Sequence, residues 1–484
     1  MISESNLKEK TVRSVFSLFF QSGYSAFLGL LANLILTIVV SPKIFGIYIT
    51  LLSAISFLNY FSDIGLAASL IQKKEVDDED IKTVFTVQQT LIITLVVIGI
   101  LTSSFVTSFY HLPKDGTYLY LTLLLSFFIS SLKTIPSVFL ERKIEYQKIV
   151  LVQIVENTFF YLLVIIFALL RFELKSFIIA VIFRSLTGLF LIYKLSPWKI
   201  SIGFNKNRFS QLISFGLPFQ SSSFLALFKD DLIILYLGKV VGFEGVGYIG
   251  WAKKWAEAPI RIIMDNVTKV LFPAISRIQD NKEKVGKLIE KVLYYLTGLI
   301  APTMVFAYFL MPYLLKIIPR YQKWQKALPL FNIFLLSSFL VIYYAPFINI
   351  FNALGKVKKS FFFMLFWTVV MWFLTPILTK TFGYFGFPIT HLFISLTFPL
   401  VLLSMKKEVP FNFFASIKPF TVSSFFMFTG LLFFKKFFLL NNYFFMPLIE
   451  IIIGTIIYLS SLILIFKIKP IEELKKIIYL NSKT

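Results

Sequence analysis

This chain of 484 residues is 57% hydrophobic and 15% charged, with a mean hydropathy of +0.80. Soluble domains carry about 25% charged residues, so the composition excludes an ordinary soluble protein. The chain has no cysteine, which excludes disulfides, thiol chemistry and cysteine metal sites. The two histidines, His111 and His391, lie far apart in the sequence and form no ligand pattern.

Long apolar runs recur from one end of the chain to the other. A helix that spans a bilayer needs about 20 mostly apolar residues, and the runs from Leu91 and Ile449 have this character. We therefore expect an all-α polytopic membrane protein with about 14 transmembrane helices. The predicted spans are 14–38, 46–70, 84–109, 117–140, 149–170, 174–193, 209–238, 247–272, 292–314, 328–354, 360–379, 384–404, 413–434 and 443–466.

The net charge of +23 suggests a nucleic-acid partner until the charges are placed on these spans. Most Lys and Arg residues fall in loops on the N-terminal side of the membrane. The positive-inside rule then predicts a multi-pass protein of the cytoplasmic (inner) membrane with both termini in the cytoplasm. Because topology accounts for the basic surplus, we expect no nucleic-acid partner. One far-side loop runs against the trend, with Lys316, Arg320, Lys323 and Lys326.

A short internal sequence repeat occurs in the two halves of the chain. Residues 33–36 (NLIL) resemble residues 231–234 (DLII), and after an insertion Gly46 matches Gly247. Each copy ends a span, makes a short far-side turn and begins the next span. Parallel repeats related by an axis along the membrane normal are a known transporter architecture. We therefore expect an N-terminal six-helix lobe (1–200), a C-terminal six-helix lobe (201–408), and an accessory helix pair with a cytoplasmic tail (409–484).

Three charged residues of the first lobe lie at mid-membrane depth. Lys133 and Glu156 are at nearly equal distance from Glu145, which lies in the loop between their spans. We interpret them as a structural ion pair. Arg184 lies in the middle of its span, too deep to reach the headgroups easily. It is therefore a candidate functional residue.

The seventh span contains three consecutive charged residues, Lys229, Asp230 and Asp231. They spread over about 200° of a helix surface and cannot all face one cavity. We expect one or two of them to pair locally or to lie near the far-side end. At least one of the acids is expected to have a functional role.

The eighth span is the most charged one, and it contains the stretch "WAKKWAEAPIRIIMDNVTKVLFP" from Trp251. Its six charged residues fall within about 160° of the helix surface, opposite an apolar stripe. They are Lys253, Lys254, Glu257, Arg261, Asp265 and Lys269.

Six charges on one span cannot face lipid, because each costs about 2.5–3.5 kcal/mol at the bilayer centre. They must face water, one another or a ligand. Glu257 and Arg261 are spaced to pair at i,i+4, but the four bases outnumber the two acids. A water-filled cavity with a cationic wall is the simplest interpretation. The alternative is an amphipathic helix in the interface, with its basic face toward the headgroups.

Several stretches of the sequence resemble a known family, the polysaccharide transporters of the multidrug/oligosaccharidyl-lipid/polysaccharide exporter superfamily. This family includes the O-antigen and capsule flippases. The resemblance rests on several stretches. They are "SVFSLFFQSG" near the N-terminus, "VVSPKIFGIYITLLSAISFLNYFSDIGLAASLIQKK" (39–74), "LISFGLPFQSSSFLALFKDDLIILYLG" (212–238) and "GVGYIGWAKKWAEAPIRIIMDNVTKVLFPAISRI" (245–278). The family's F-G-x-P stretch, acidic residue, G-x-Y turn and F-P pair fall at Phe215–Pro218, Asp231, Gly247–Ile249 and Phe272–Pro273.

The resemblance implies a V-shaped transporter with two lobes that carries undecaprenyl-diphosphate-linked glycan to the outer leaflet by alternating access. We expect the partners to be this glycan and membrane lipid, with polysaccharide polymerase machinery as a possible further partner. No cofactor is expected, apart from a coupling proton or sodium ion. The candidate diphosphate ligands are Arg261, Lys253, Lys254, Arg184, Lys229 and Lys269, and the candidates for ion coupling are Asp230, Asp231, Glu257 and Asp265.

Three alternatives stay open. A flippase for the peptidoglycan lipid precursor has the same requirements. A drug exporter of the same superfamily needs an acidic, aromatic cavity for cationic drugs, whereas the surplus charge here is positive. A membrane glycosyltransferase is disfavoured because every predicted far-side loop is short.

Overall fold

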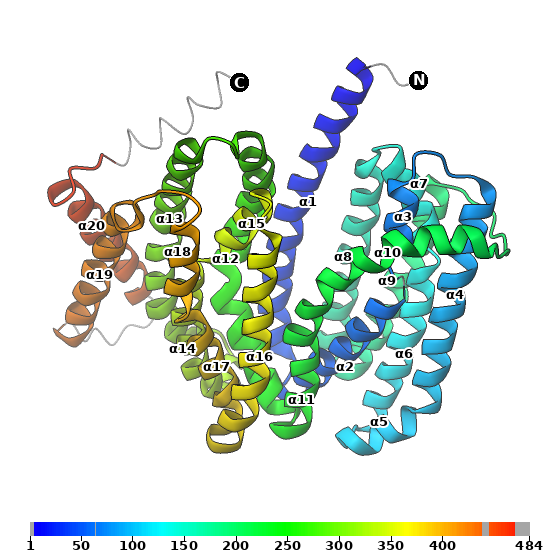
Figure 1. Ribbon diagram of the computed structural model, residues 1–484. Coiled ribbons are helices and arrows are strands. Elements are labelled where there is room, and N and C mark those ends of the chain that lie inside the picture. Colours follow the sequence, from blue (N-terminus) through cyan, green and yellow to red (C-terminus); the bar gives the residue numbers. More distant parts are fainter. Residues whose placement is uncertain (1–3, 63, 438–444, 470–484) are drawn as a thin grey trace. The chain divides into compact units, whose positions relative to one another are not determined.

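The computed structural model describes residues 4–62, 64–437 and 445–469, and these ranges are helical without any strand (Figure 1). Within them, 11 segments are long and apolar enough to cross a membrane. The prediction of an all-α polytopic membrane protein is therefore confirmed. The count of 14 spans stays a prediction, because the charged region of the seventh and eighth spans is not among the 11 and residues 357–406 form one continuous candidate.

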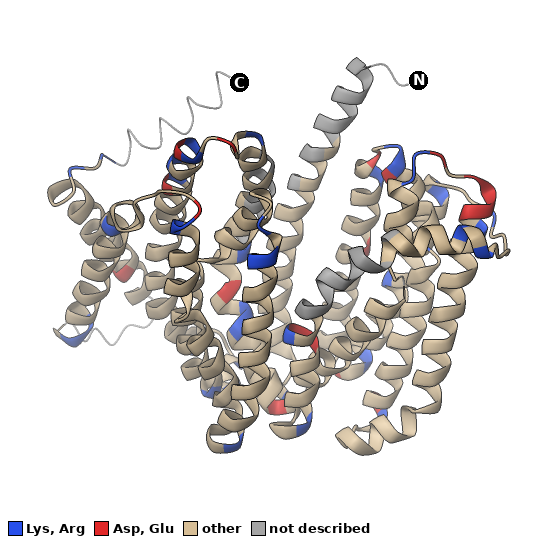
Figure 2. Ribbon diagram, in the orientation of Figure 1, with Lys and Arg blue, Asp and Glu red and all other residues tan. Residues whose placement is uncertain are grey.

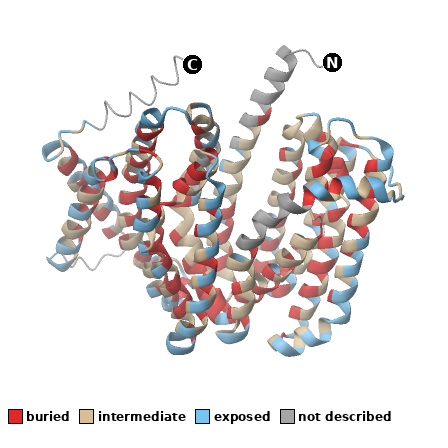
Figure 3. Cartoon of the chain, viewed as in Figure 1, coloured by how far each residue is buried: buried red, intermediate tan, exposed pale blue. Residues whose placement is uncertain are grey.

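The surface of the helices is apolar along their length. Phe190 and Leu464 expose 72% and 77% of their area, and many other Leu, Ile and Phe side chains are also exposed. Exposed positions recur along the helices in Figure 3. Charged residues gather mainly at helix ends and loops, and few lie on the helix faces (Figure 2). In a soluble protein such faces would associate, but in a bilayer the lipid tails cover them.

The chain divides into two compact units. Unit 1 contains residues 1–250 and 364–384, and unit 2 contains residues 251–363 and 385–484. The predicted second lobe begins at residue 201, whereas unit 1 extends through residue 250. Units defined by packing need not coincide with sequence repeats, so the lobe boundaries stay a prediction.

Unit 1 is a helical bundle in which α8 packs against α1 and α9, and α6 packs against α2, α4 and α9. Its helices are α1 (Glu4–Val39), α2 (Pro42–Phe61), α3 (Leu66–Gln72), α4 (Asp78–Leu101), α5 (Ser103–Tyr110), α6 (Lys114–Ser131), α7 (Thr134–Arg142), α8 (Tyr146–Leu169), α9 (Leu174–Leu195), α10 (Lys206–Leu227), the π-helical segment η1 (Phe228–Leu232) and α11 (Ile233–Val240).

The remaining helices lie in unit 2, except that α12, α16 and η3 each have residues in both units. They are α12 (Gly242–Ile278), α13 (Lys282–Ile317), the 3₁₀ segment η2 (Tyr321–Ala327), α14 (Leu328–Val341), α15 (Ala345–Ala353), α16 (Val357–Phe382), η3 (Gly383–Phe385), α17 (Gly386–Ser395), α18 (Phe398–Lys406), α19 (Phe413–Phe437) and α20 (Met446–Leu464). The predicted accessory pair corresponds to α19 and α20, which pack on α13 around Phe309, Met427 and Leu431.

A proline breaks the predicted span 117–140 into α6 and α7. Pro136 has no N–H to donate to the carbonyl of Leu132, four residues earlier. The hydroxyl of Tyr193 on α9 donates to that carbonyl instead, at 3.2 Å. The break places Lys133 at the N-cap of α7, inside the bundle.

The two copies of the short internal sequence repeat contact each other within unit 1. Gly46 on α2 and Gly247 in the first turns of α12 lie where the helices cross. A Cβ on Gly46 would lie 1.7 Å from the carbonyl oxygen of Phe243, and a Cβ on Gly247 would lie 2.0 Å from that of Pro42. Each contacted residue lies about one turn before the glycine of its own helix, so the contact is reciprocal. A two-fold relation between repeats produces this pattern.

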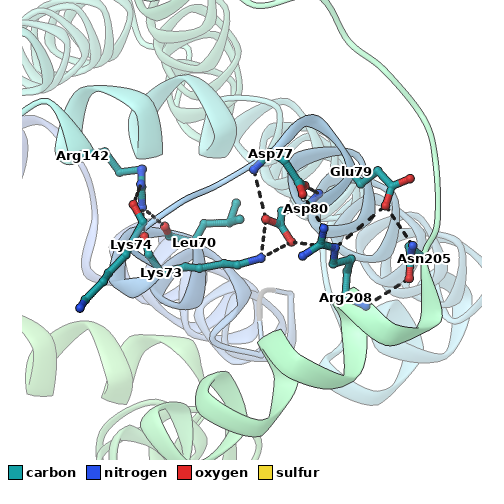
Figure 4. Close-up of polar contacts among 9 residues, drawn as sticks. All are labelled: Leu70, Lys73, Lys74, Asp77, Glu79, Asp80, Arg142, Asn205 and Arg208. Atoms are coloured by element: carbon teal, nitrogen blue, oxygen red, sulfur yellow. Dashed lines mark hydrogen bonds and ion pairs between the residues drawn. The ribbon is translucent and has the colours of Figure 1, made fainter.

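Two networks of polar contacts hold the loop between α3 and α4 (Figure 4). In the first, Arg142 at the end of α7 donates to the carbonyls of Leu70, Ile71, Lys73 and Lys74 at 2.5–3.3 Å. These carbonyls lie at the C-terminal end of α3, where helical partners are lacking. The guanidinium therefore caps this helix.

The second network attaches the start of α10 to the start of α4. Asp77 and Asp80 form a capping box on α4, and Arg208 reaches Asp77 at 2.6 Å. The Asp80 N–H and the Arg208 guanidinium hold the pKa of Asp77 below its usual value. Lys73 contacts Asp80 at 2.6 Å, and the Asn205 amide donates to Glu79 at 3.0 Å. These contacts fix the start of α10 and the residues before it to the start of α4.

Candidate functional site

Unit 1 contains a cavity of about 310 Å³ at the middle of its spans. Three charged residues line it: Lys133, Glu156 and Arg184. Most of its other polar lining consists of hydroxyls and one amide, from Tyr48, Ser56, Asn59, Ser126, Ser130 and Ser185. The cavity therefore brings the predicted ion pair and the isolated arginine into one polar chamber.

Lys133 and Glu156 form an ion pair across this cavity, with 2.5 Å between Nζ and Oε1. The Glu156 side chain is only 8% exposed and that of Lys133 is 19% exposed. Gly188 on α9 makes room for the carboxylate, because a Cβ there would lie 1.4 Å from Oε1. The glutamate is therefore pressed against the α9 backbone.

Arg184 lies one turn from Gly188 on α9. Its guanidinium carbon is 5.5 Å from the ring centroid of Phe160, which is one turn from Glu156 on α8. Tyr48 stacks on the same ring, at 6.3 Å between centroids. Among the described residues, Arg184 has no ion pair and no hydrogen bond. The cavity thus holds two cations against one carboxylate.

The three consecutive charges of the seventh span lie in the π-helical segment η1, between α10 and α11. The side chain of Asp230 is exposed, whereas Lys229 and Asp231 are half-buried. The indole N–H of Trp372 donates to the carbonyl of Phe228 at 2.9 Å, where the helix widens. Single π-helical turns are frequent at functional sites.

In unit 2, α12 carries a cluster of charges. Glu257 lies between two bases, at 2.9 Å from Arg261 and 3.9 Å from Lys253. Lys253 also lies 5.7 Å from the ring centroid of Phe387 on α17. Lys254 is half-buried and has no ion pair in the described ranges. Three bases against one acid leave a surplus of two positive charges on this face.

Buried apolar residues run along α12 beside the charged ones, on an overlapping part of the helix surface. Ala256, Ile260, Met264, Leu271 and Ile275 are buried. The helix is also anchored just before the charged cluster, where the indole N–H of Trp251 donates to the Tyr321 hydroxyl at 2.9 Å. Buried and charged positions therefore adjoin on α12, in agreement with the side chains of Lys253 and Glu257, which are each only 21% exposed.

The predicted site residues thus fall in separate groups. Arg184 joins Lys133 and Glu156 in unit 1, whereas Lys253, Glu257 and Arg261 meet on α12 in unit 2. The side chains of Asp265 and Lys269 lie outside the described part of the chain. No group of His, Asp and Glu that could hold a metal ion occurs among the described residues.

One feature of the site was not predicted, namely that Arg184 shares a cavity with the Lys133–Glu156 pair. Pro136 carried only part of the signal, because a proline at that position predicts a helix break next to Lys133. The position of Arg184 relative to α8 carries no such signal.

Comparisons with known proteins agree with the resemblance noted above. The family described as "Polysaccharide biosynthesis protein" matches residues 35–329, more than half of the chain. The chain is 23% identical over 347 residues to the lipopolysaccharide biosynthesis protein WzxC of Escherichia coli K12, covering 70% of this chain and 69% of that protein. It is 20% identical over 333 residues to the succinoglycan biosynthesis transport protein ExoT of Rhizobium meliloti, covering 68% and 67%.

The chain spans 62–69% of the length of the curated relatives that it matches. Among solved structures, it is similar to the lipid II flippase MurJ in an inward closed conformation. The TM-score is 0.76 at 16% identity, covering 94% of this chain and 99% of that one. At this identity the likeness establishes the fold alone.

Proposed function

Because this chain belongs to the polysaccharide biosynthesis protein family, we propose that it is a flippase for lipid-linked oligosaccharide. It would carry an undecaprenyl-diphosphate-linked glycan across the cytoplasmic membrane for cell-surface polysaccharide synthesis, acting as a transporter and not as an enzyme. The observation that carries the proposal is the family match, supported by relatives named for polysaccharide biosynthesis or transport.

The charge distribution supports an anionic cargo. A diphosphate and a glycan cannot cross hydrocarbon unaided, so their carrier must offer them polar groups at membrane depth. Both the unit 1 cavity and the α12 face carry more bases than acids. Arginine suits this role because its planar guanidinium binds phosphate oxygens in pairs.

We assign diphosphate binding to Arg261 together with Lys253 or Lys254, aided by Arg184. Lys229 and Lys269 remain further candidates. Alternating access would expose these residues first to the cytoplasm and then to the outside. A coupling proton or sodium ion would bind at one of the carboxylates of Asp230, Asp231, Glu257 or Asp265. Both termini would lie in the cytoplasm, and the lipid-linked substrate would enter from the inner leaflet.

Arg261→Ala is expected to slow translocation by about tenfold or more. The side chain is 69% exposed beside Glu257, which leaves guanidinium donors for a ligand. A hydrogen bond to a charged group contributes about 1.5–3 kcal/mol, and 1.4 kcal/mol corresponds to a factor of ten. The measurement is transfer of lipid-linked glycan to the outer face of proteoliposomes, at matched protein amounts.

Arg277→Ala is the matched control for Arg261→Ala. Arg277 is exposed in the last turn of the same helix and has no ion pair in the described ranges. It is expected to retain activity. Full activity of the Arg261 variant would remove this residue from the mechanism.

Depletion of the protein in cells tests the function as a whole. We expect a lipid-linked oligosaccharide of surface-polysaccharide synthesis to accumulate on the inner leaflet. The main rival is a flippase for the peptidoglycan lipid precursor, and accumulation of that precursor instead would support the rival. Sugar transfer by the purified protein would contradict both.

A further inference from the structure

The unit 1 cavity has one more positive than negative charge, at a depth where an uncompensated charge is costly. Lys133 and Arg184 face a single carboxylate, Glu156. A lone charge at mid-membrane costs about 2.5–3.5 kcal/mol on the insertion scale. Because Arg184 has no polar partner in the described ranges, the chamber needs water or an anion beside it.

We infer that this cavity binds one oxyanionic group, a phosphate or a carboxylate, between Arg184 and Lys133, and that Glu156 competes with this anion for Lys133. As a binding site the proposal stands on the geometry of the cavity. A role for this site in binding transported substrate rests on the proposed function.

The size and lining of the cavity fit a single group. Ligand pockets usually measure about 300–1,000 Å³, so a volume of about 310 Å³ admits one phosphate or one sugar ring and not a whole oligosaccharide. Arg184 offers five N–H donors. The Ser185 hydroxyl donates to the carbonyl of Val181, so the Ser126 hydroxyl, 2.6 Å from it, is the one that can turn its proton to a bound oxygen.

Glu156 is buried in the cavity wall against α9, whereas Lys133 has a flexible stem that allows it to change partners. The carboxylate is pressed against Gly188, where no side chain would fit. Lys133 lies at the helix break and has a flexible four-carbon stem that ends in a point charge. An anion at Arg184 would therefore draw the ammonium away from Glu156 and would also be repelled by the carboxylate.

This competition would keep anion binding weak. Glu156 forms its ion pair with Lys133 when the cavity is empty, and the pair forms again when the anion leaves. A transport site must bind well enough to load and weakly enough to release. The Glu156 carboxylate allows both loading and release, because it neutralises Lys133 whenever the anion is absent.

The test is equilibrium binding of radiolabelled sulfate to the purified full-length protein, at fixed ionic strength. Sulfate is an oxyanion whose charge does not change near neutral pH. We expect Arg184→Gln to weaken binding by about tenfold or more, and Glu156→Gln to tighten it by about tenfold, a change of 1.4 kcal/mol. In Lys133→Gln/Glu156→Gln the tightening should disappear. A purely structural pair predicts no tightening in any variant.

Several results would overturn the site. Wild-type affinity in Arg184→Gln would do so, as would an unchanged affinity in a Glu156→Gln protein that elutes as a single species. The double variant, which removes both charges, guards against misfolding of the single ones. Loss of all sulfate binding in Arg261→Ala, with Arg184→Gln unaffected, would move the anion site to α12.

Competition separates the two sources of oxyanion. Displacement of sulfate by glucuronate, with no effect of glucose, would identify a sugar carboxylate. Displacement by a short-chain prenyl phosphate would identify the lipid headgroup. Because the readout is binding to purified protein, a negative result leaves the proposed function to be judged by the lipid that accumulates on depletion.

Discussion

Gly247→Ala is expected to destabilise the protein by about 3 kcal/mol or more. The new Cβ would lie 2.0 Å from the backbone carbonyl oxygen of Pro42, so a flexible side chain cannot relieve the clash. The helices α2 and α12 would have to move apart where they cross. Gly46→Ala should have a similar effect, because its Cβ would lie 1.7 Å from the carbonyl of Phe243. The measurement is the melting temperature of detergent-solubilised protein.

Gly23→Ala is the matched control for both glycines. Gly23 is exposed on α1, and a Cβ there meets nothing within 4 Å. Alanine is favoured over glycine inside a helix by about 0.5–1 kcal/mol, so this variant should be unchanged or slightly more stable. An unchanged melting temperature in Gly247→Ala would mean that the close crossing is absent in the protein.

This crossing shows what a repeat in the sequence does and does not reveal. The match of Gly46 to Gly247 was visible as a similarity between two turns. That the two glycines pack against each other's helices could not be read from it, because similarity indicates equivalent roles and not contact. The reciprocal contact supports the repeat interpretation.

Depth along a span predicted some polar contacts and missed others. Lys133 and Glu156 are on consecutive spans joined by a short loop, so their depths could be compared, and the two side chains meet. Arg184 joins them from a third helix, whose rotation depends on packing. The π-helical turn at Lys229–Asp231 was not predicted either, because a regular helix was assumed when the charges were spread around it.

The Arg142 cap had no signature in the sequence, because a guanidinium that binds backbone carbonyls places no demand on residue type at its partners. Arg142→Ala is expected to destabilise unit 1 by about 3 kcal/mol. Four carbonyls at the end of α3 lose their donor, and hydrogen bonds to charged groups contribute about 1.5–3 kcal/mol each before water replaces part of them. Arg142 also complements the negative end of the helix.

Trypsin gives a local readout of this cap, because Lys73 and Lys74 lie in the loop that Arg142 holds. We expect faster cleavage after Lys74 in Arg142→Ala, together with a lower melting temperature. Arg142→Lys should recover less than half of the loss, since an ammonium cannot reproduce the planar fork. The adjacent Lys143 is exposed and has no ion pair in the described ranges, so Lys143→Ala should behave as wild type. If the cleavage rate and the melting temperature are the same in Arg142→Ala and Lys143→Ala, the carbonyl contacts do not stabilise α3. Water would then hydrogen-bond these carbonyls as well as the guanidinium does.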